Sequence, residues 1–189
     1  MVNNRNAHLN HRKVLTDFFE KLPKSATQEE VKYGIHTTLS ESGSRSWYII
    51  NPGWLDHLEI NHPRQIYIGT GTPFPSIECR GYIVTFVRQK NIIIDEAIVC
   101  LQLLDLLTFF KKAPNTAIPS LLHKYTELLQ NISREEKRML VNLSRKYSPF
   151  VRTVLSLAMD AIYERNLSVR IADTLNPLTF KKHREKISL

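Results

Sequence analysis

Between Ala97 and Thr108 the sequence places apolar side chains on almost every side of a helix. The positions at helical spacing are Ala97, Leu101, Leu104, Leu107 and Thr108, and the flanking positions are Val99, Leu103 and Leu106. A helix with so wide an apolar surface is buried, because it has no face left to turn toward water. We therefore expect this helix at the centre of a core, with the helices that follow packed around it.

Three more helices are predicted after this one. The segment Pro119–Leu129 carries a proline in its first turn, where the missing N–H costs nothing. Ser133 and Glu136 have the spacing of a capping box, which predicts that a helix begins there. Ser148-Pro149 then begins a fourth helix, Phe150–Arg165, with apolar residues on one face. The C-terminal half is thus predicted to be a bundle of about four helices.

Strand signals dominate the middle of the chain. Runs of β-branched and aromatic residues at 47–50, 65–68 and 77–86 are separated by turn sequences rich in glycine and proline. These runs predict a small antiparallel sheet over about residues 47–88, with helices on one face. Two short helices are expected before it, Arg12–Lys21 and one that begins at Thr27 and runs to about Ser40. The predicted fold class is therefore α+β.

The composition is that of a globular protein, with 42% hydrophobic and 23% charged residues in 189. No apolar run is long enough to cross a bilayer, and residues 1–13 contain no apolar stretch typical of a secretory signal. Cys79 and Cys100 do not make a disulfide framework. We therefore expect a cytoplasmic protein that does not contact membranes.

No catalytic or metal-binding pattern is found in the sequence. Gly69-Thr70-Gly71 begins like a dinucleotide-binding loop, but Phe74 stands where the third glycine belongs. His57 and His62 are close in sequence, yet neither cysteine has a Cys or His at ligand spacing. The sequence therefore predicts a non-catalytic binding protein that needs neither a metal nor another cofactor.

Basic residues are concentrated near the C-terminus of a chain whose net charge is +8: from Arg134 onward there are twelve Lys and Arg against six Asp and Glu. Arg138, Arg145 and Arg152 recur every seven positions. The candidate binding residues are Arg134, Lys137, Arg138, Arg145, Lys146, Arg152, Lys181, Lys182 and Arg184. Such a set suits nucleic-acid phosphates or an acidic protein, and a solvated helix face accounts for the same pattern.

Seven sequence blocks follow one another in an order that resembles a known family. They are Ser42–Arg45 with Trp47–Ile49, Trp54–Pro63, Gln65–Ile68, Ala97–Leu106, Ile132–Leu140, Tyr147-Ser148-Pro149 with Val151-Arg152, and Leu175-Asn176-Pro177-Leu178-Thr179. Together they resemble the C-terminal domain of the AbiEi-type antitoxin family of type IV toxin–antitoxin systems, in its branch of transcriptional regulators. The last block matches the family's L-N-P-L-T ending.

The resemblance implies an antitoxin domain at residues 27–179, preceded by a polar segment at 1–26 with one short helix and followed by a basic tail at 180–189. It also implies a role in phage defence and a partner, a nucleotidyltransferase-like toxin. Members of the family usually bind their own promoter through an N-terminal winged helix. Only two short helices are predicted before Trp47, so promoter binding is not expected of this chain. A basic nucleic-acid-binding or regulatory protein is the alternative function.

Overall fold

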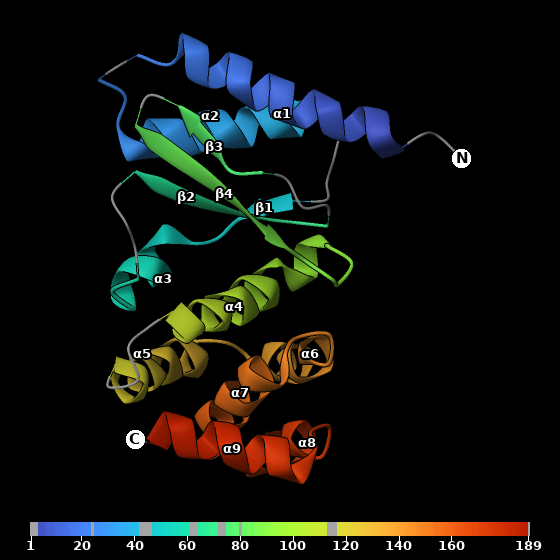
Figure 1. The fold of residues 1–189 in the computed structure, drawn as a ribbon. Helices are drawn as coiled ribbons and strands as arrows, with labels where there is room; N and C mark the ends of the chain where they lie inside the picture. The colour runs from blue at the N-terminus through green and yellow to red at the C-terminus, as the bar shows by residue number, and fades with distance from the viewer. Residues whose placement is uncertain are drawn as a thin grey trace. The chain divides into compact units, whose positions relative to one another are not determined.

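The structure is a computed structural model that describes residues 4–23, 25–41, 47–60, 64–71, 75–79, 81–112 and 117–188. Its elements form two compact units (Figure 1). The sheet unit contains residues 1–50 and 62–94, and the helical unit contains residues 51–61 and 95–189. The predicted α+β class is confirmed, since helices accompany a small sheet of four strands.

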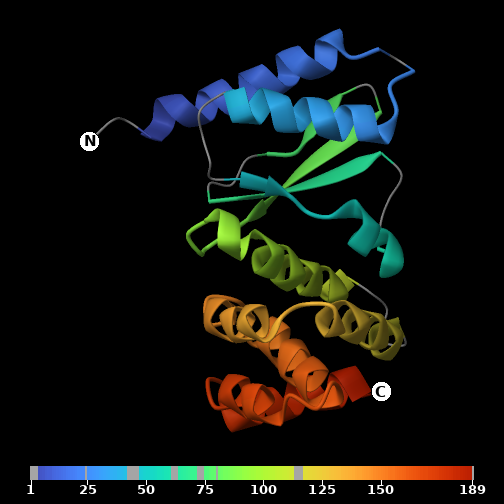
Figure 2. The same cartoon turned by 180° about the vertical axis from the view of Figure 1, so that it is seen from behind.

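The sheet unit begins with two helices, α1 (Asn4–Lys21) and α2 (Gln28–Glu41). Its strands are β1 (Trp47–Ile49), β2 (Gln65–Thr70), β3 (Ile77–Cys79) and β4 (Tyr82–Arg88), in the spatial order β1-β2-β4-β3. Figure 2 shows α1 and α2 side by side next to this sheet. The capping box predicted at Thr27 is present, since the Thr27 N–H donates to Glu30 Oε2 at 2.7 Å and the Glu30 N–H donates to Thr27 Oγ1 at 3.3 Å.

The two central strands, β2 and β4, run parallel, with Gln65 opposite Ile83 and Thr70 opposite Arg88. The prediction of an antiparallel sheet is wrong for this pair, although β1–β2 and β3–β4 are antiparallel. The chain does reverse direction from β2 to β3 and again to β4, but β4 lies beside β2 and displaces β3 to the edge. The short β3, with Glu78 exposed, suits an edge position, whereas the longer β4 pairs on both sides.

The core of the sheet unit joins α1, α2 and three of the strands. Its buried residues are Leu15, Phe19, Leu22, Val31, Ile35, Leu39, Ile66, Ile68, Ile77, Tyr82 and Val84. Those of α1 and α2 recur every three or four positions, as expected for one buried helix face. α1 begins at Asn4, earlier than the predicted Arg12, and residues of the predicted polar segment 1–26 are part of this core.

The helical unit contains α3 (Pro52–His57) and then a series of further helices. Its members are η1 (Asp95–Ala97), α4 (Ile98–Phe109), η2 (Phe110–Lys112), α5 (Ile118–Gln130), α6 (Arg134–Ser144), α7 (Pro149–Ala161), α8 (Arg165–Ala172) and α9 (Pro177–Ser188). The position predicted for α4 is confirmed, because five of its leucines are fully buried. Even so, no helix in the described part of the chain has the length and apolar character needed to cross a bilayer.

The structure divides the end of the chain into more helices than the four predicted. The predicted helix Phe150–Arg165 stops at Ala161, since Tyr163 adopts a left-handed backbone conformation (φ 64°) and the chain turns into α8. Residues 180–188 of the predicted basic tail belong to α9. Asn176 begins that helix, because its Oδ1 accepts the N–H groups of Leu178 and Thr179.

Replacing Ser133 by alanine should lower the free energy of unfolding by about 1 kcal/mol. The Ser133 hydroxyl accepts the Glu136 N–H at 3.2 Å, and Glu136 Oε2 accepts the Ser133 N–H at 2.7 Å, so both halves of the predicted capping box are formed. Urea denaturation measures the loss. Ser120→Ala, on the exposed first turn of α5, is the control and should cause no destabilisation; equal losses in the two variants would contradict the capping role.

Candidate functional site

The nine basic residues predicted from the sequence lie on three helices of the helical unit or in the turn after α6. Arg134, Lys137 and Arg138 belong to α6, Arg145 and Lys146 follow its last residue, Arg152 lies on α7, and Lys181, Lys182 and Arg184 lie on α9. The seven-residue repeat of arginines therefore crosses from one helix to the next at Ser148-Pro149. It does not form a stripe on a single helix.

Arg152 contributes to the packing of the helical unit. Its Nη1 donates to the backbone oxygen of Thr174 at 2.8 Å and to Thr174 Oγ1 at 3.0 Å. These bonds connect α7 to the chain that follows α8. Burial lowers the pKa of the Arg152 guanidinium, although a guanidinium stays charged under all ordinary conditions. Arg152 is thus engaged inside the protein and is a poor candidate for contact with a partner.

The other basic residues of α6 differ in exposure. The Lys137 side chain is only 14% exposed, and its Nζ lies 3.8 Å from Glu164 Oε1. Arg138 is half exposed, and its 3.9 Å separation from Glu135 makes a weak surface ion pair. Arg134, Arg145 and Lys146 are exposed. We call Arg134, Arg138 and Arg145 the α6 basic face, since at helical spacing these three residues lie on the same side of α6 and its C-cap.

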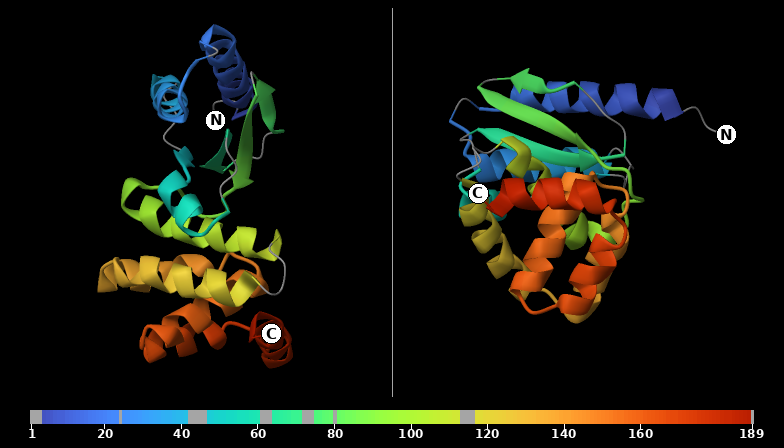
Figure 3. Two further views of the ribbon diagram at one scale, coloured as in Figure 1. Left: turned by 90° about the vertical axis from the view of Figure 1, so that its left-hand side faces the viewer. Right: turned by 60° about the horizontal axis from the view of Figure 1, so that its bottom comes forward.

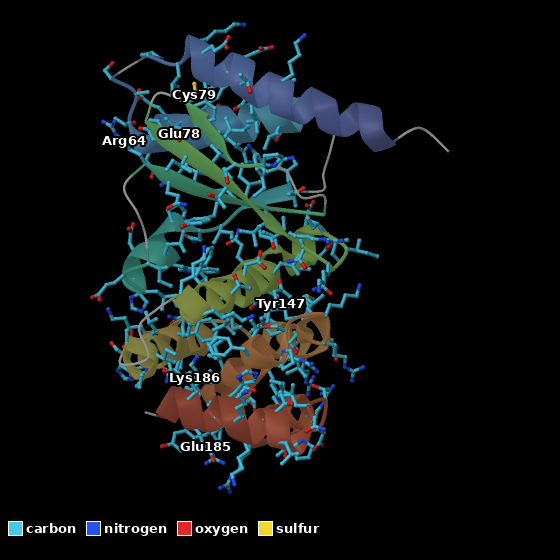
Figure 4. The ribbon with its side chains drawn as sticks, viewed as in Figure 1. Arg64, Glu78, Cys79, Tyr147, Glu185 and Lys186 are labelled. Carbon is cyan, nitrogen blue, oxygen red and sulfur yellow. The ribbon has the colours of Figure 1, made fainter. Side chains whose placement is uncertain are left out.

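A pocket of about 430 Å³ lies where η2, the first turns of α5 and α7, and α9 meet. Its lining residues are Phe110, Lys111, Ile118, Ser148, Pro149, Phe150, Lys182, His183 and Lys186. Phe110, Ile118 and Phe150 are almost fully buried, whereas the three lysines are exposed. Figure 3 shows α9 beside α7, and Figure 4 shows Lys186 on α9. The pocket thus has an apolar floor and a cationic rim.

The charged groups of the pocket act on one another. Lys111 Nζ lies 5.8 Å from the centre of the Phe150 ring, and the His183 ring meets Phe150 edge-on at 5.7 Å. Burial is the main cause that lowers the pKa of His183, and the charges of Lys182, Lys111 and Lys186 lower it further. Among the described residues that line the pocket, none is acidic. The pocket is therefore a concentrated positive region.

Of the pocket's cationic residues, sequence reasoning found only Lys182. Lys111 was missed because it is far from the basic C-terminal third in sequence and approaches it only through folding. Lys186 lies one helical turn after Lys182, but this spacing has meaning only if residues 177–188 are helical. The Asn176-Pro177 pair is the signal that could have shown this, because asparagine favours the N-cap and proline the first turn.

Cys100 and His57 both contact other groups within the helical unit. The Cys100 thiol is buried and donates to the backbone oxygen of Glu136 at 3.4 Å, and burial raises its pKa to about 12, so it stays protonated. His57 Nε2 lies 3.0 Å from Glu127 Oε2, while His62 lies outside the described residues. In the described ranges, no group of three His, Cys, Asp or Glu is placed to hold a metal ion.

Comparisons of the chain with protein-family models, with curated proteins and with solved structures found no match.

Proposed function

We propose that this chain is a non-catalytic binding protein of the antitoxin kind, which neutralises a nucleotidyltransferase-like toxin by direct contact. The proposal rests on the family resemblance of the seven sequence blocks and on the structural use of their residues. The α6 basic face is the contact surface in this proposal, and the partner presents an acidic surface to it.

The observation that carries the proposal is a hydrogen bond between two of the seven sequence blocks, within the helical unit. The Tyr147 hydroxyl, in the sixth block, donates to Asp105 Oδ1, in the fourth, at 2.7 Å. In the last block, Asn176 caps α9 and Leu175 is buried. If the blocks belong to one family, they are expected to contact one another in its fold, and the bond between Tyr147 and Asp105 is a contact of this kind. This supports the resemblance and assigns these polar residues to the architecture of the helical unit.

The α6 basic face is suited to a partner because its charges are available. Arg134, Arg138 and Arg145 project from the same side of the helix and are exposed. Water screens an exposed ion pair such as Arg138–Glu135, so this pair holds the arginine only weakly. Exposed charges of one sign steer an oppositely charged protein and raise its association rate. An acidic toxin surface would therefore be recognised through this face.

Reversing three charges of this face should abolish neutralisation. The variant combines Arg134→Glu, Arg138→Glu and Arg145→Glu, and we expect about a tenfold to hundredfold weaker complex, since three surface pairs of up to about 1 kcal/mol each are lost. Growth during co-expression with the product of the neighbouring gene, which the family resemblance implies is a nucleotidyltransferase-like toxin, measures the effect together with co-purification.

The control for this experiment carries the same change of net charge elsewhere. Lys13→Glu, Arg88→Glu and Lys90→Glu are exposed positions of the sheet unit and should leave neutralisation intact. If the unaltered chain fails to relieve the toxicity of that neighbour, the antitoxin role is refuted. If both triple variants fail equally, the α6 basic face is not the contact surface.

Nucleic-acid binding is the second candidate, favoured by the net charge of +8. It requires an affinity for short DNA or RNA that falls as salt rises, with a log–log slope of about −0.9 per phosphate contacted on duplex DNA. Fluorescence anisotropy across a salt series separates the two functions. The α6 basic face would be assigned to nucleic acid if the triple variant reduced a steep salt dependence of binding and left toxin binding unchanged.

A further inference from the structure

The lysines of the pocket between η2 and α9 form no ion pair with the residues that the structure describes. In the described part of the chain, no ion pair is formed by Lys111, Lys182 or Lys186, whereas the adjacent Lys181 lies 3.9 Å from Glu185. Figure 4 shows Glu185 and Lys186 as neighbours on α9. Three exposed cations therefore meet at this pocket, where they would attract a bound anion.

The lysines reach the pocket from two different elements. Lys111 belongs to η2, and Lys182 and Lys186 are one turn apart on α9, so they lie on one face of that helix. All three line the same pocket as His183, and their charges add to burial in lowering the pKa of that imidazole. Bringing like charges together costs free energy, and an anion with two or more charges removes this cost. The rim therefore favours a multiply charged anion over a single carboxylate.

The floor of the pocket requires more than a phosphate group. Pro149 is the exposed apolar residue of the lining, and Phe110, Ile118 and Phe150 lie almost fully buried beneath it, so an inorganic ion would leave the proline ring in contact with water. The volume of about 430 Å³ lies within the range of sites for small organic ligands, about 300–1,000 Å³. A ligand that fills the pocket thus combines a polyanionic group with an apolar, compact organic group.

We propose that this pocket binds a nucleoside di- or triphosphate, with the phosphates between Lys111, Lys182 and Lys186 and the nucleoside against Pro149 and Phe150. The Ser148 hydroxyl, whose oxygen accepts the Val151 N–H at 3.4 Å, keeps its hydrogen for a phosphate oxygen. The site is separate from the α6 basic face, so the inference does not depend on the proposed antitoxin role.

Titration calorimetry with the full chain tests this inference. The probes are ATP, ADP, inorganic tripolyphosphate and adenosine, at low salt. We expect ATP to bind at least tenfold more tightly than tripolyphosphate, and adenosine to bind most weakly. Lys182→Gln and Lys186→Gln should each weaken ATP about tenfold. Lys181→Gln, the neighbouring residue that does not line the pocket, is the matched control and should change the affinity less than twofold.

His183 offers a second readout by NMR. The groups that face it are Lys111 from η2 and Lys182 and Lys186 from its own helix, while α5 and α7 present the uncharged Ile118, Ser148, Pro149 and Phe150. Bound phosphate stabilises the protonated ring, so ATP should raise the pKa of His183 and bind more tightly as pH falls through its titration. A shift of the His183 resonances on addition of ATP, absent in Lys182→Gln, would support the assignment.

Three results would overturn the proposal. Equal affinities for ATP and tripolyphosphate would show that the floor takes no part in binding. Equal losses in Lys181→Gln and Lys182→Gln would show general attraction to a basic helix in place of a defined pocket. Preference for a single-stranded oligonucleotide over ATP would assign the pocket to a nucleic acid.

Loss of ATP binding in Lys182→Gln with unchanged toxin neutralisation would show that this site is independent of the α6 basic face.

Discussion

Phe19→Ala is expected to lower the free energy of unfolding of the sheet unit by about 3–5 kcal/mol. The Phe19 side chain is fully buried, and its ring centre lies 5.2 Å from that of Phe18 and 6.4 Å from that of Tyr82. It therefore joins α1 to the first residue of β4. Alanine removes the ring and leaves a cavity that the helices on one side and the sheet on the other cannot fully close.

Urea denaturation followed by Trp47 fluorescence measures this loss, because Trp47 lies in β1. Trp54 belongs to the helical unit and is replaced by phenylalanine in every variant, so that the signal reports the sheet unit alone. The matched control is Tyr33→Ala on α2, where the aromatic ring is 75% exposed and the expected change is within about 0.5 kcal/mol. A loss below about 1 kcal/mol for Phe19→Ala would mean that α1 is not part of the core.

Sequence patterns predicted the elements whose signal is local. The Thr27 and Ser133 capping boxes each use two residues three positions apart, and both helices begin where these boxes place them. The burial of α4 was also predictable, because a helix with apolar residues on almost every side is stable only when other elements surround it. In each case the information lies within a few adjacent turns.

Features that depend on distant contacts were not predictable in the same way. Alternating apolar residues in β2 and β4 indicate strands, but they do not specify which strand lies beside which, and the parallel pairing of these two followed only from the structure. The turn at Tyr163 was missed for a related reason, since a left-handed tyrosine has no strong sequence signal.

The candidate site shows the same limit. The basic residues of α6 were found by counting charges along the chain, yet Arg152 proved to be bonded to Thr174 within the unit. The pocket required Lys111 and α9 to be brought together, and neither charge counting nor periodicity relates these segments. The distribution of charge along the sequence thus located the basic region. The tertiary structure was needed to tell which cations bond within the protein, as Arg152 does, and which line the pocket.

Tyr147→Phe should lower the free energy of unfolding by about 1–3 kcal/mol, because it removes a hydrogen bond to a buried carboxyl group. Asp105 is fully buried on α4, whose other buried residues are five leucines, Cys100 and Phe109. A polar group in such surroundings is costly unless it is hydrogen-bonded. The Tyr147 hydroxyl supplies one of its bonds, at 2.7 Å, and so connects α4 to the turn between α6 and α7.

A double-mutant cycle with Asp105→Ala isolates this interaction. If the bond is the main effect of the tyrosine hydroxyl, Tyr147→Phe should cost no more than about 0.5 kcal/mol once Asp105 is alanine, which gives a coupling energy of about 1–2 kcal/mol. Tyr163→Phe is the matched control, since that hydroxyl belongs to a side chain that is 95% exposed, and it should have no effect. Strictly additive losses at 105 and 147 would show no coupling between the two positions. The contact between the fourth and sixth blocks, on which the proposed function relies, would then contribute nothing to the fold.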